Sequence, residues 1–128
     1  MNNEDFVTYD IAVRLKEVGF GWPCRTYWMK AYIDKDIMTL REDLRGSNHN
    51  EYAPDYYSAP TLAQAQKWLL GKGYYINVQL LSRNIWSYVI ENEYGDEIHS
   101  VLQTWDCYES ALSAGTEAAL KLIEEGEG

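Results

Sequence analysis

The 128-residue sequence predicts an α+β fold, in which an antiparallel sheet of about five strands carries helices packed on one face. Two observations predict it. Apolar side chains recur at spacings of three and four residues in three segments, which is typical of amphipathic helices. Short segments with period-two alternation lie between them and are joined by tight turns, which favours neighbouring antiparallel strands. The expected order is α-β-β-loop-α-β-β-β-α, and we expect residues 1–128 to form a single domain.

The first helix is expected over residues 4–18. Thr8 is suited to the N-cap position, and Asp10 falls in the first turn, where the helix dipole favours an anion. Gly19 and Gly21 then end the helix. The buried stripe is predicted to consist of Ile11, Ala12, Leu15 and Val18.

An aromatic strand is expected over residues 26–33, followed by a turn at 34–36 and a short return strand at 37–40. Residues 41–57 contain Pro54 and little periodic apolar content, so we expect a long surface loop there. Connections of this length are often functional or mobile. The large side chains of this segment either fix the loop to the body of the protein or contact a partner; they are Tyr52, Tyr56 and Tyr57.

The centre of the chain reads as a capped helix, a glycine stop and a strand. Thr61 and Gln64 have the spacing of a capping box, and Pro60 suits the residues just before a helix. The glycines at 71 and 73 supply the conformational freedom for the helix end, and a strand follows over residues 75–81. The apolar stripe of this helix is predicted to be Leu62, Ala65, Trp68 and Leu69.

Two more strands are expected, over residues 85–92 and 98–104, with turns at 82–84 and 93–96. The strand at 85–92 is partly apolar on both faces, which indicates an inner position in the sheet. The last helix is expected to begin near Asp106, with Glu109 completing a capping box. Residues 124–128 are expected to form a flexible tail. The inward stripe of this helix contains small residues that would allow a close approach to the sheet, namely Ala111, Gly115 and Ala119.

The three predicted helix starts resemble one another. Each combines a small residue, a large apolar residue, two variable positions and an alanine, at residues 8–12, 61–65 and 107–111. This recurrence indicates either a remnant duplication of a helix-then-strand unit or the shared sequence requirements of capped amphipathic helices.

The chain is acidic, with a net charge of −9, and no lysine or arginine lies between Arg83 and Lys121. Such a surface repels phosphate backbones, which argues against direct nucleic-acid binding and against anionic membranes. The acidic interval either keeps the protein soluble or contacts a basic partner protein. The candidate interaction residues of this interval are Glu91, Glu93, Asp96 and Glu97.

No catalytic, cofactor-binding or metal-binding residue is predicted. His49 and His99 have no partner histidine nearby, and Cys24 and Cys107 lie far apart in the sequence, so zinc spacing is absent. The chain has no phosphate-binding loop, dinucleotide fingerprint or nucleophile elbow. A pocket that joined a histidine to carboxylates or to a cysteine would favour a small enzyme, such as a hydrolase.

A cytoplasmic location is expected. No apolar run approaches the roughly 20 residues needed to cross a bilayer, and the acidic N-terminal residues lack the apolar region of a signal peptide. Free thiols are therefore expected, although the two cysteines could form one disulfide.

Two resemblances bear on function. Residues 61–123 have the helix, three strands, helix order of double-stranded-RNA-binding domains. Those domains grip phosphates with a lysine cluster at the start of the last helix, where this chain has Asp106-Cys-Tyr-Glu109, so the resemblance extends to topology alone.

The second resemblance covers most of the chain outside the 41–57 segment. Three blocks resemble a group of small uncharacterised proteins from prophages and mobile elements of gut anaerobic bacteria. The resemblance implies a phage-related accessory gene and no particular activity. The first block is Phe6-Val-Thr-Tyr9 with Leu15-Lys-Glu-Val-Gly-Phe20 and Pro23-Cys24. The second is Tyr57-Ser-Ala-Pro-Thr-Leu-Ala-Gln-Ala-Gln-Lys-Trp-Leu69, and the third is Tyr108–Leu112 with Ala118–Ile123.

The expected function is thus protein–protein interaction without catalysis. The partner is unidentified and is expected to be basic, and the chain itself is expected to be a monomer or a homodimer formed through an exposed strand. The alternatives are an acidic mimic of nucleic acid that inhibits a DNA-binding enzyme, and a small enzyme with an unrecognised site.

Overall fold

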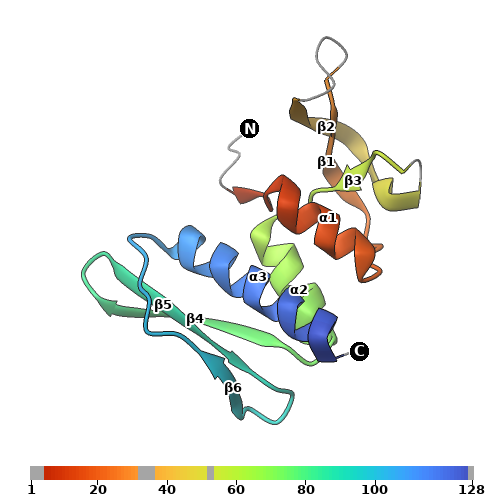
Figure 1. Cartoon of the computed structure of the whole chain (residues 1–128). Helices are drawn as coiled ribbons and strands as arrows, with labels where there is room; N and C mark the ends of the chain where they lie inside the picture. Colours follow the sequence, from red (N-terminus) through yellow and green to blue (C-terminus); the bar gives the residue numbers. More distant parts are fainter. Residues whose placement is uncertain (1–4, 32–36, 52–53, 127–128) are drawn as a thin grey trace. The chain divides into compact units, whose positions relative to one another are not determined.

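In the computed structural model, described over residues 5–31, 37–51 and 54–126, the chain has the predicted α+β composition (Figure 1). It divides into two compact units, Met1–Thr61 and Leu62–Gly128. The strands form two antiparallel three-stranded sheets, one in each unit, so the expectation of a single sheet of about five strands was wrong. The single domain expected over residues 1–128 stays a prediction.

The first unit contains one α-helix and a sheet in the order β2-β1-β3. Thr8 is the N-cap of the helix as predicted, because its Oγ1 accepts a hydrogen bond from the Ile11 backbone N–H at 3.3 Å. The helix buries Ile11, Ala12 and Leu15, while Val18 is its half-buried C-cap. The elements are α1 (Tyr9–Glu17), β1 (Cys24–Lys30), β2 (Met38–Ser47), the 3₁₀ turn η2 (His49–Glu51) and β3 (Tyr57–Ser58).

The long surface loop expected over residues 41–57 was wrong. β2 continues to Ser47, with Arg41 opposite Tyr27 and Glu42 opposite Thr26 in the β1–β2 ladder. The part of this segment after Ser47 contains η2 and the start of β3. β2 is an edge strand, so its charged side chains can reach water while its backbone pairs with β1, and no apolar alternation is required. The expected turn at 34–36 lies outside the described residues.

The second unit has the predicted order of helix, three strands and helix. Its sheet has the order β4-β5-β6, which places β5 in the centre as expected. α2 packs on β4, α3 packs on β4 and β5, and the two helices lie side by side on one face of this sheet (Figure 1). The elements are α2 (Leu62–Gly71), β4 (Tyr75–Ser82), β5 (Ile85–Glu91), β6 (Glu97–Ser100) and α3 (Tyr108–Gly126).

The core of the second unit follows the predicted helix stripes. The four stripe residues predicted for α2 are all buried. In α3, the small residues at 111, 115 and 119 are buried, and so are Leu112, Thr116 and Leu120. A Cβ atom placed on Gly115 would lie 2.6 Å from Cγ2 of Ile76 on β4, so α3 approaches the sheet as closely as the small residues predicted.

Both ends of α3 differ from the prediction. The Ala111 backbone N–H donates to the Cys107 carbonyl, so the N-cap is Cys107 and not Asp106, the residue that the expected capping box with Glu109 requires at that position. The Cys107 thiol donates to Ser110 Oγ at 3.1 Å instead. The helix continues to Gly126, which corrects the flexible tail expected over 124–128 as far as residue 126, because glutamate is a good helix former at exposed positions. Residues 127 and 128 lie outside the described residues.

β6 is shorter than the strand expected over residues 98–104. It ends at Ser100, and the chain returns at Trp105, whose backbone exchanges two 2.8 Å hydrogen bonds with Trp86 of β5. Leu102 in between is fully exposed. The apolar residues after Ser100 were therefore a misleading strand signal.

Candidate interaction surface

The turn between β5 and β6 is a well-ordered hairpin end. Asn92 organises it, because its Oδ1 accepts hydrogen bonds from the backbone N–H groups of Tyr94 and Asp96 at 2.9 and 3.0 Å. The Asn92 and Asp96 backbones are also bonded at 2.8 Å. Gly95 has φ = 84°, the left-handed conformation that the sequence predicted for it. The side chains of this turn are thus presented on a fixed backbone.

The four predicted acidic residues gather at this hairpin. We call them, together with Tyr94, the acidic hairpin: Glu91, Glu93, Tyr94, Asp96 and Glu97. Glu91 lies directly opposite Glu97 in the β5–β6 ladder, and like charges in that arrangement are destabilising. In the described part of the chain, no ion pair reaches any of the four carboxylates. The hairpin therefore concentrates negative charge that the described residues do not neutralise.

Tyr94 was missed as a site residue. Its side chain is 80% exposed at the tip of the turn, in the midst of the carboxylates. An aromatic ring held in water at a fixed turn is a common anchor in protein interfaces. The signal was present in the sequence, because a tyrosine between Glu93 and Gly95 in a tight turn cannot reach a core.

An open hollow of about 400 Å³ borders the acidic hairpin. Carboxylate, aromatic, apolar and ammonium groups from the end of α2, the connection that follows it, the hairpin and β6 all meet there, so the hollow could accept a protruding side chain. Its lining residues are Gly71, Lys72, Gly73, Tyr74, Asn92, Glu93, Tyr94 and Ile98.

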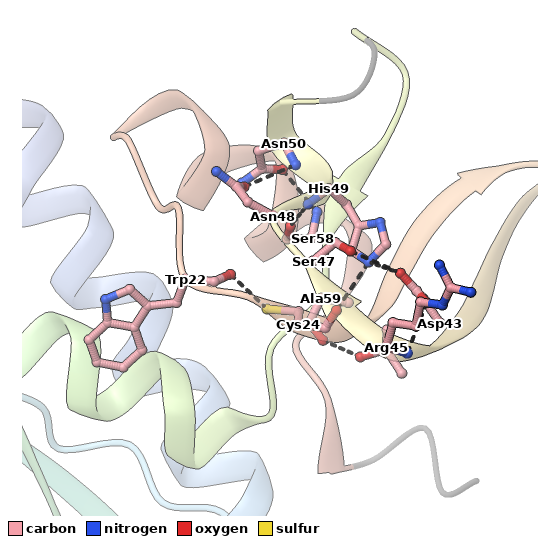
Figure 2. Close-up of polar contacts among 11 residues, drawn as sticks. Trp22, Cys24, Asp43, Arg45, Ser47, Asn48, His49, Asn50, Ser58 and Ala59 are labelled. Atoms are coloured by element: carbon pink, nitrogen blue, oxygen red, sulfur yellow. Dashed lines mark hydrogen bonds and ion pairs between the residues drawn. The ribbon is translucent and has the colours of Figure 1, made fainter.

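A second polar cluster lies in the first unit, around His49 (Figure 2). The imidazole is 2% exposed, and its Nε2 lies 3.0 Å from the Cys24 carbonyl oxygen and 3.6 Å from Asp43 Oδ2. Because a carbonyl only accepts, Nε2 carries the proton of this hydrogen bond. The ring also stacks on Tyr27, with centroids 4.2 Å apart. The His49 backbone N–H donates to Ser58 Oγ at 3.0 Å.

This cluster joins a histidine, a carboxylate and a cysteine backbone, yet its groups serve the fold. Asp43 accepts hydrogen bonds from the Arg45 backbone and from Ser47 Oγ, which shapes the end of β2. Burial raises the pKa of the Cys24 thiol to about 12, and the thiol donates to the Trp22 carbonyl at 3.4 Å. A neutral, buried thiol is a poor nucleophile and a poor metal ligand.

The tyrosines proposed as loop contacts are packed within the first unit. Tyr56 stacks on Tyr27 with centroids 5.3 Å apart, and Tyr57 meets Tyr9 edge to face at 5.5 Å. Lys16 lies 4.7 Å from the Tyr57 ring centroid and donates to the Tyr56 carbonyl. Burial, followed by the neighbouring Tyr9, raises the pKa of Tyr57. These contacts favour the reading in which the tyrosines fix the segment; Tyr52 lies outside the described residues.

The second histidine and the second cysteine each make a contact of their own within the second unit. His99 on β6 stacks on Tyr88 of β5, and Cys107 caps α3 with a half-buried thiol. Both cysteines are free thiols. Within residues 5–31, 37–51 and 54–126, no group of three or more histidine, cysteine, aspartate or glutamate side chains could hold a metal ion.

The two thiols are expected to differ in reactivity. At pH 8, Cys24 has almost no thiolate because its pKa is near 12, and it is 2% exposed. Cys107 is more accessible, so a thiol reagent should modify it first and leave Cys24 intact in the native protein. Mass spectrometry should show one modification in buffer and two in denaturant. Equal labelling rates for the two native thiols would contradict the burial of Cys24.

Comparison with known proteins places the chain in no group: no family model, curated protein or solved structure matches it. None of the helices in the described part combines the length and the apolar content that spanning a membrane requires. The fold and the acidic hairpin define the protein as an acidic α+β chain with an exposed, charged turn.

Proposed function

We propose that this protein acts without catalysis, by binding a basic surface of a partner protein through the acidic hairpin. The observation that carries the proposal is the fixed turn that holds Tyr94, 80% exposed, among four carboxylates that lack ion pairs within the described residues. We also propose an accessory role in a phage or mobile element, which is the context that the sequence blocks implied.

Electrostatics and packing both favour such a partner. The opposed pair Glu91 and Glu97 is unfavourable in the free protein, and a lysine or arginine between them would relieve the repulsion. Tyr94 offers a flat apolar surface, and arginine stacks well on aromatic rings. The neighbouring hollow, lined by Glu93 and Ile98, could take the aliphatic stem of such a residue. Complementary charge would also speed association at low salt.

Mimicry of nucleic acid is a narrower form of the same proposal. In that case the basic partner is a DNA-binding enzyme, and the four carboxylates occupy places that phosphates take in its complex. The two forms of the proposal can be distinguished by competition with duplex DNA. DNA would displace this protein from the partner if the protein is a mimic, and it would not displace the protein from a basic surface that does not bind DNA.

Neutralising the hairpin is expected to abolish partner capture. The triple change Glu93→Gln, Asp96→Asn, Glu97→Gln removes three charges at the site, whereas Asp106→Asn, Glu109→Gln, Glu125→Gln removes three exposed charges on or next to α3. Affinity capture from cells of the source, read by quantitative mass spectrometry, should show partners retained by wild type and by the α3 variant and lost with the hairpin variant.

The purified partner then gives the quantitative test. Tyr94→Ala should weaken binding by about tenfold or more, since an aromatic anchor contributes on the order of 1.4 kcal/mol or more. Binding should also weaken as salt increases, because exposed charges are screened. Equal binding by the hairpin variant and the α3 variant would reject the hairpin as the binding surface.

A further inference from the structure

The free edge of β4 is the least protected feature of the described structure. The two sheets have four edge strands: β2 and β3 in the first unit, β4 and β6 in the second. Unpaired edges expose backbone N–H and C=O groups, and proteins protect them with charges, short strands, prolines or bulges. Three of these four edges carry such protection.

Each of the three protected edges has an identifiable feature that disfavours pairing with another strand. β2 carries four charged side chains, at positions 41, 42, 43 and 45. β3 has only two residues. β6 has four residues, begins with Glu97, and pairs with β5 through a register shift beside Glu91.

β4 has no charge, proline or shortening that would protect it, although the Ile76 carbonyl near its start accepts a hydrogen bond from the Gln66 side chain of α2 at 2.6 Å. The strand is eight residues long, Tyr-Ile-Asn-Val-Gln-Leu-Leu-Ser, with no charge and no proline, and its ladder with β5 is regular from Tyr75 to Leu80. Leu80 and Leu81 are each 58% exposed, and Tyr75 is 37% exposed. An uncharged, regular edge with exposed apolar side chains is characteristic of a strand that pairs with another chain.

We infer that two copies of this chain pair through β4, antiparallel about a two-fold axis at Val78, to form a continuous six-stranded sheet. A two-fold axis perpendicular to the sheet keeps each side chain on the same face of the sheet. Two residues that face each other across the axis therefore differ by an even number of positions in the sequence. Centring the axis at Val78 sets Ile76 opposite Leu80 and Asn77 opposite Gln79. Apolar side chains then meet apolar ones, and the two side-chain amides can hydrogen-bond.

Charge also favours a second copy at this edge. The protein carries a net charge of −9, so most of its surface repels another copy. Residues 75–82 contain no carboxylate. The acidic hairpin lies at the Tyr75 end of the sheet, since Tyr75 is opposite Glu91. Antiparallel pairing therefore places the two acidic hairpins at opposite ends of the six-stranded sheet.

The first test measures the mass of the full chain in solution. Sedimentation equilibrium should show a species of twice the 14.8 kDa chain mass as concentration rises. The double change Asn77→Lys, Gln79→Lys sets like charges across the axis and should raise the dimer Kd by about tenfold or more. The matched control, Ser100→Lys, Gln103→Lys, adds the same charge at exposed positions on β6 and beyond it, and should leave the Kd within about twofold of wild type.

The second test fixes the register by disulfide formation in a Cys107→Ser background. Val78→Cys places two thiols at the axis and should form a covalent dimer quickly under mild oxidation. Asn77→Cys and Gln79→Cys should each react slowly alone and quickly when mixed, because they face each other across the axis.

Two outcomes would overturn the inference. The first is a 14.8 kDa species at every concentration, with no covalent dimer of Val78→Cys. The second is a dimer that survives Asn77→Lys, Gln79→Lys and dissociates in Ser100→Lys, Gln103→Lys, which would assign self-association to the β6 edge. Circular dichroism of each variant, matched to wild type, ensures that a loss of dimer does not reflect unfolding.

Discussion

Gly115→Ala is expected to lower the free energy of unfolding by about 1–2 kcal/mol, although alanine is the better helix former. The added Cβ would lie 2.6 Å from Ile76 Cγ2 and 3.2 Å from Tyr88 Cγ, well inside the usual 3.5–4.0 Å separation of carbon atoms. Ile76 is fully buried and Tyr88 is 4% exposed, so neither can move into solvent. Overpacking costs about 1–3 kcal/mol, and an overlap at 2.6 Å with a buried side chain favours the upper part of that range, so a net loss of about 1–2 kcal/mol remains after the roughly 1 kcal/mol gained in helix propensity.

The matched control is Gly71→Ala in α2. A Cβ at Gly71 meets no atom within 4 Å, so this change should be neutral or should stabilise by up to about 1 kcal/mol. Urea unfolding followed by tryptophan fluorescence measures both variants. Combining Gly115→Ala with Ile76→Ala removes the clashing methyl, and the loss should be smaller than the sum of the two single losses. A Gly115→Ala protein as stable as Gly71→Ala would show that α3 does not depend on this close approach.

Local signals were sufficient for the type and order of the elements in the second unit, although not for the end of β6 or for the two ends of α3. α2 buries the four residues that its spacing selected, and α3 uses its small residues where the sequence placed them. Each signal there arises within a few residues, from apolar periodicity, turn glycines and caps. The similar helix starts also share a role, because the alanines at 12, 65 and 111 are all fully buried.

The first unit was less predictable, because its order depends on contacts between distant residues. β2 is an edge strand that pairs with β1. Its charged side chains interrupt the alternation of apolar and polar residues that would have predicted a strand. His49 binds a carbonyl 25 residues earlier in the chain, and Asn50 donates to the Phe20 carbonyl 30 residues earlier. No spacing rule anticipates such pairs, so the segment resembled a loop.

The acidic hairpin was partly predictable from the sequence. Its carboxylates and its glycine turn were visible in the sequence, since composition and turn chemistry are local. The opposition of Glu91 and Glu97 depends on the register of the β5–β6 ladder, which shifts by one residue just before this pair. A hairpin of regular register would place a different residue opposite Glu91, so the like-charge pair could be found only from the structure.

His49→Ala is expected to lower the free energy of unfolding by about 3 kcal/mol, the larger of the two stability effects. The change removes a ring that is 2% exposed, ends its stacking on Tyr27, and takes away the donor to the Cys24 carbonyl. The cavity and the lost hydrogen bond both contribute, because a buried carbonyl without its donor costs roughly 1–3 kcal/mol. His49→Phe keeps the ring and the stacking but lacks the donor, so it should recover only the part of the loss that comes from the cavity and the stacking.

His99→Ala is the matched control for this cluster. His99 is only half-buried and meets Tyr88 at a centroid distance of 6.0 Å, so its removal should cost about 0.5–1.5 kcal/mol. Chemical denaturation gives both values, and labelling of Cys24 by a thiol reagent reports locally on the first unit. If His49→Ala opens that unit, Cys24 becomes reactive, whereas His99→Ala leaves it protected. Equal stability losses for the two histidines, with Cys24 protected in both, would show that β1, η2 and β3 hold together without the imidazole.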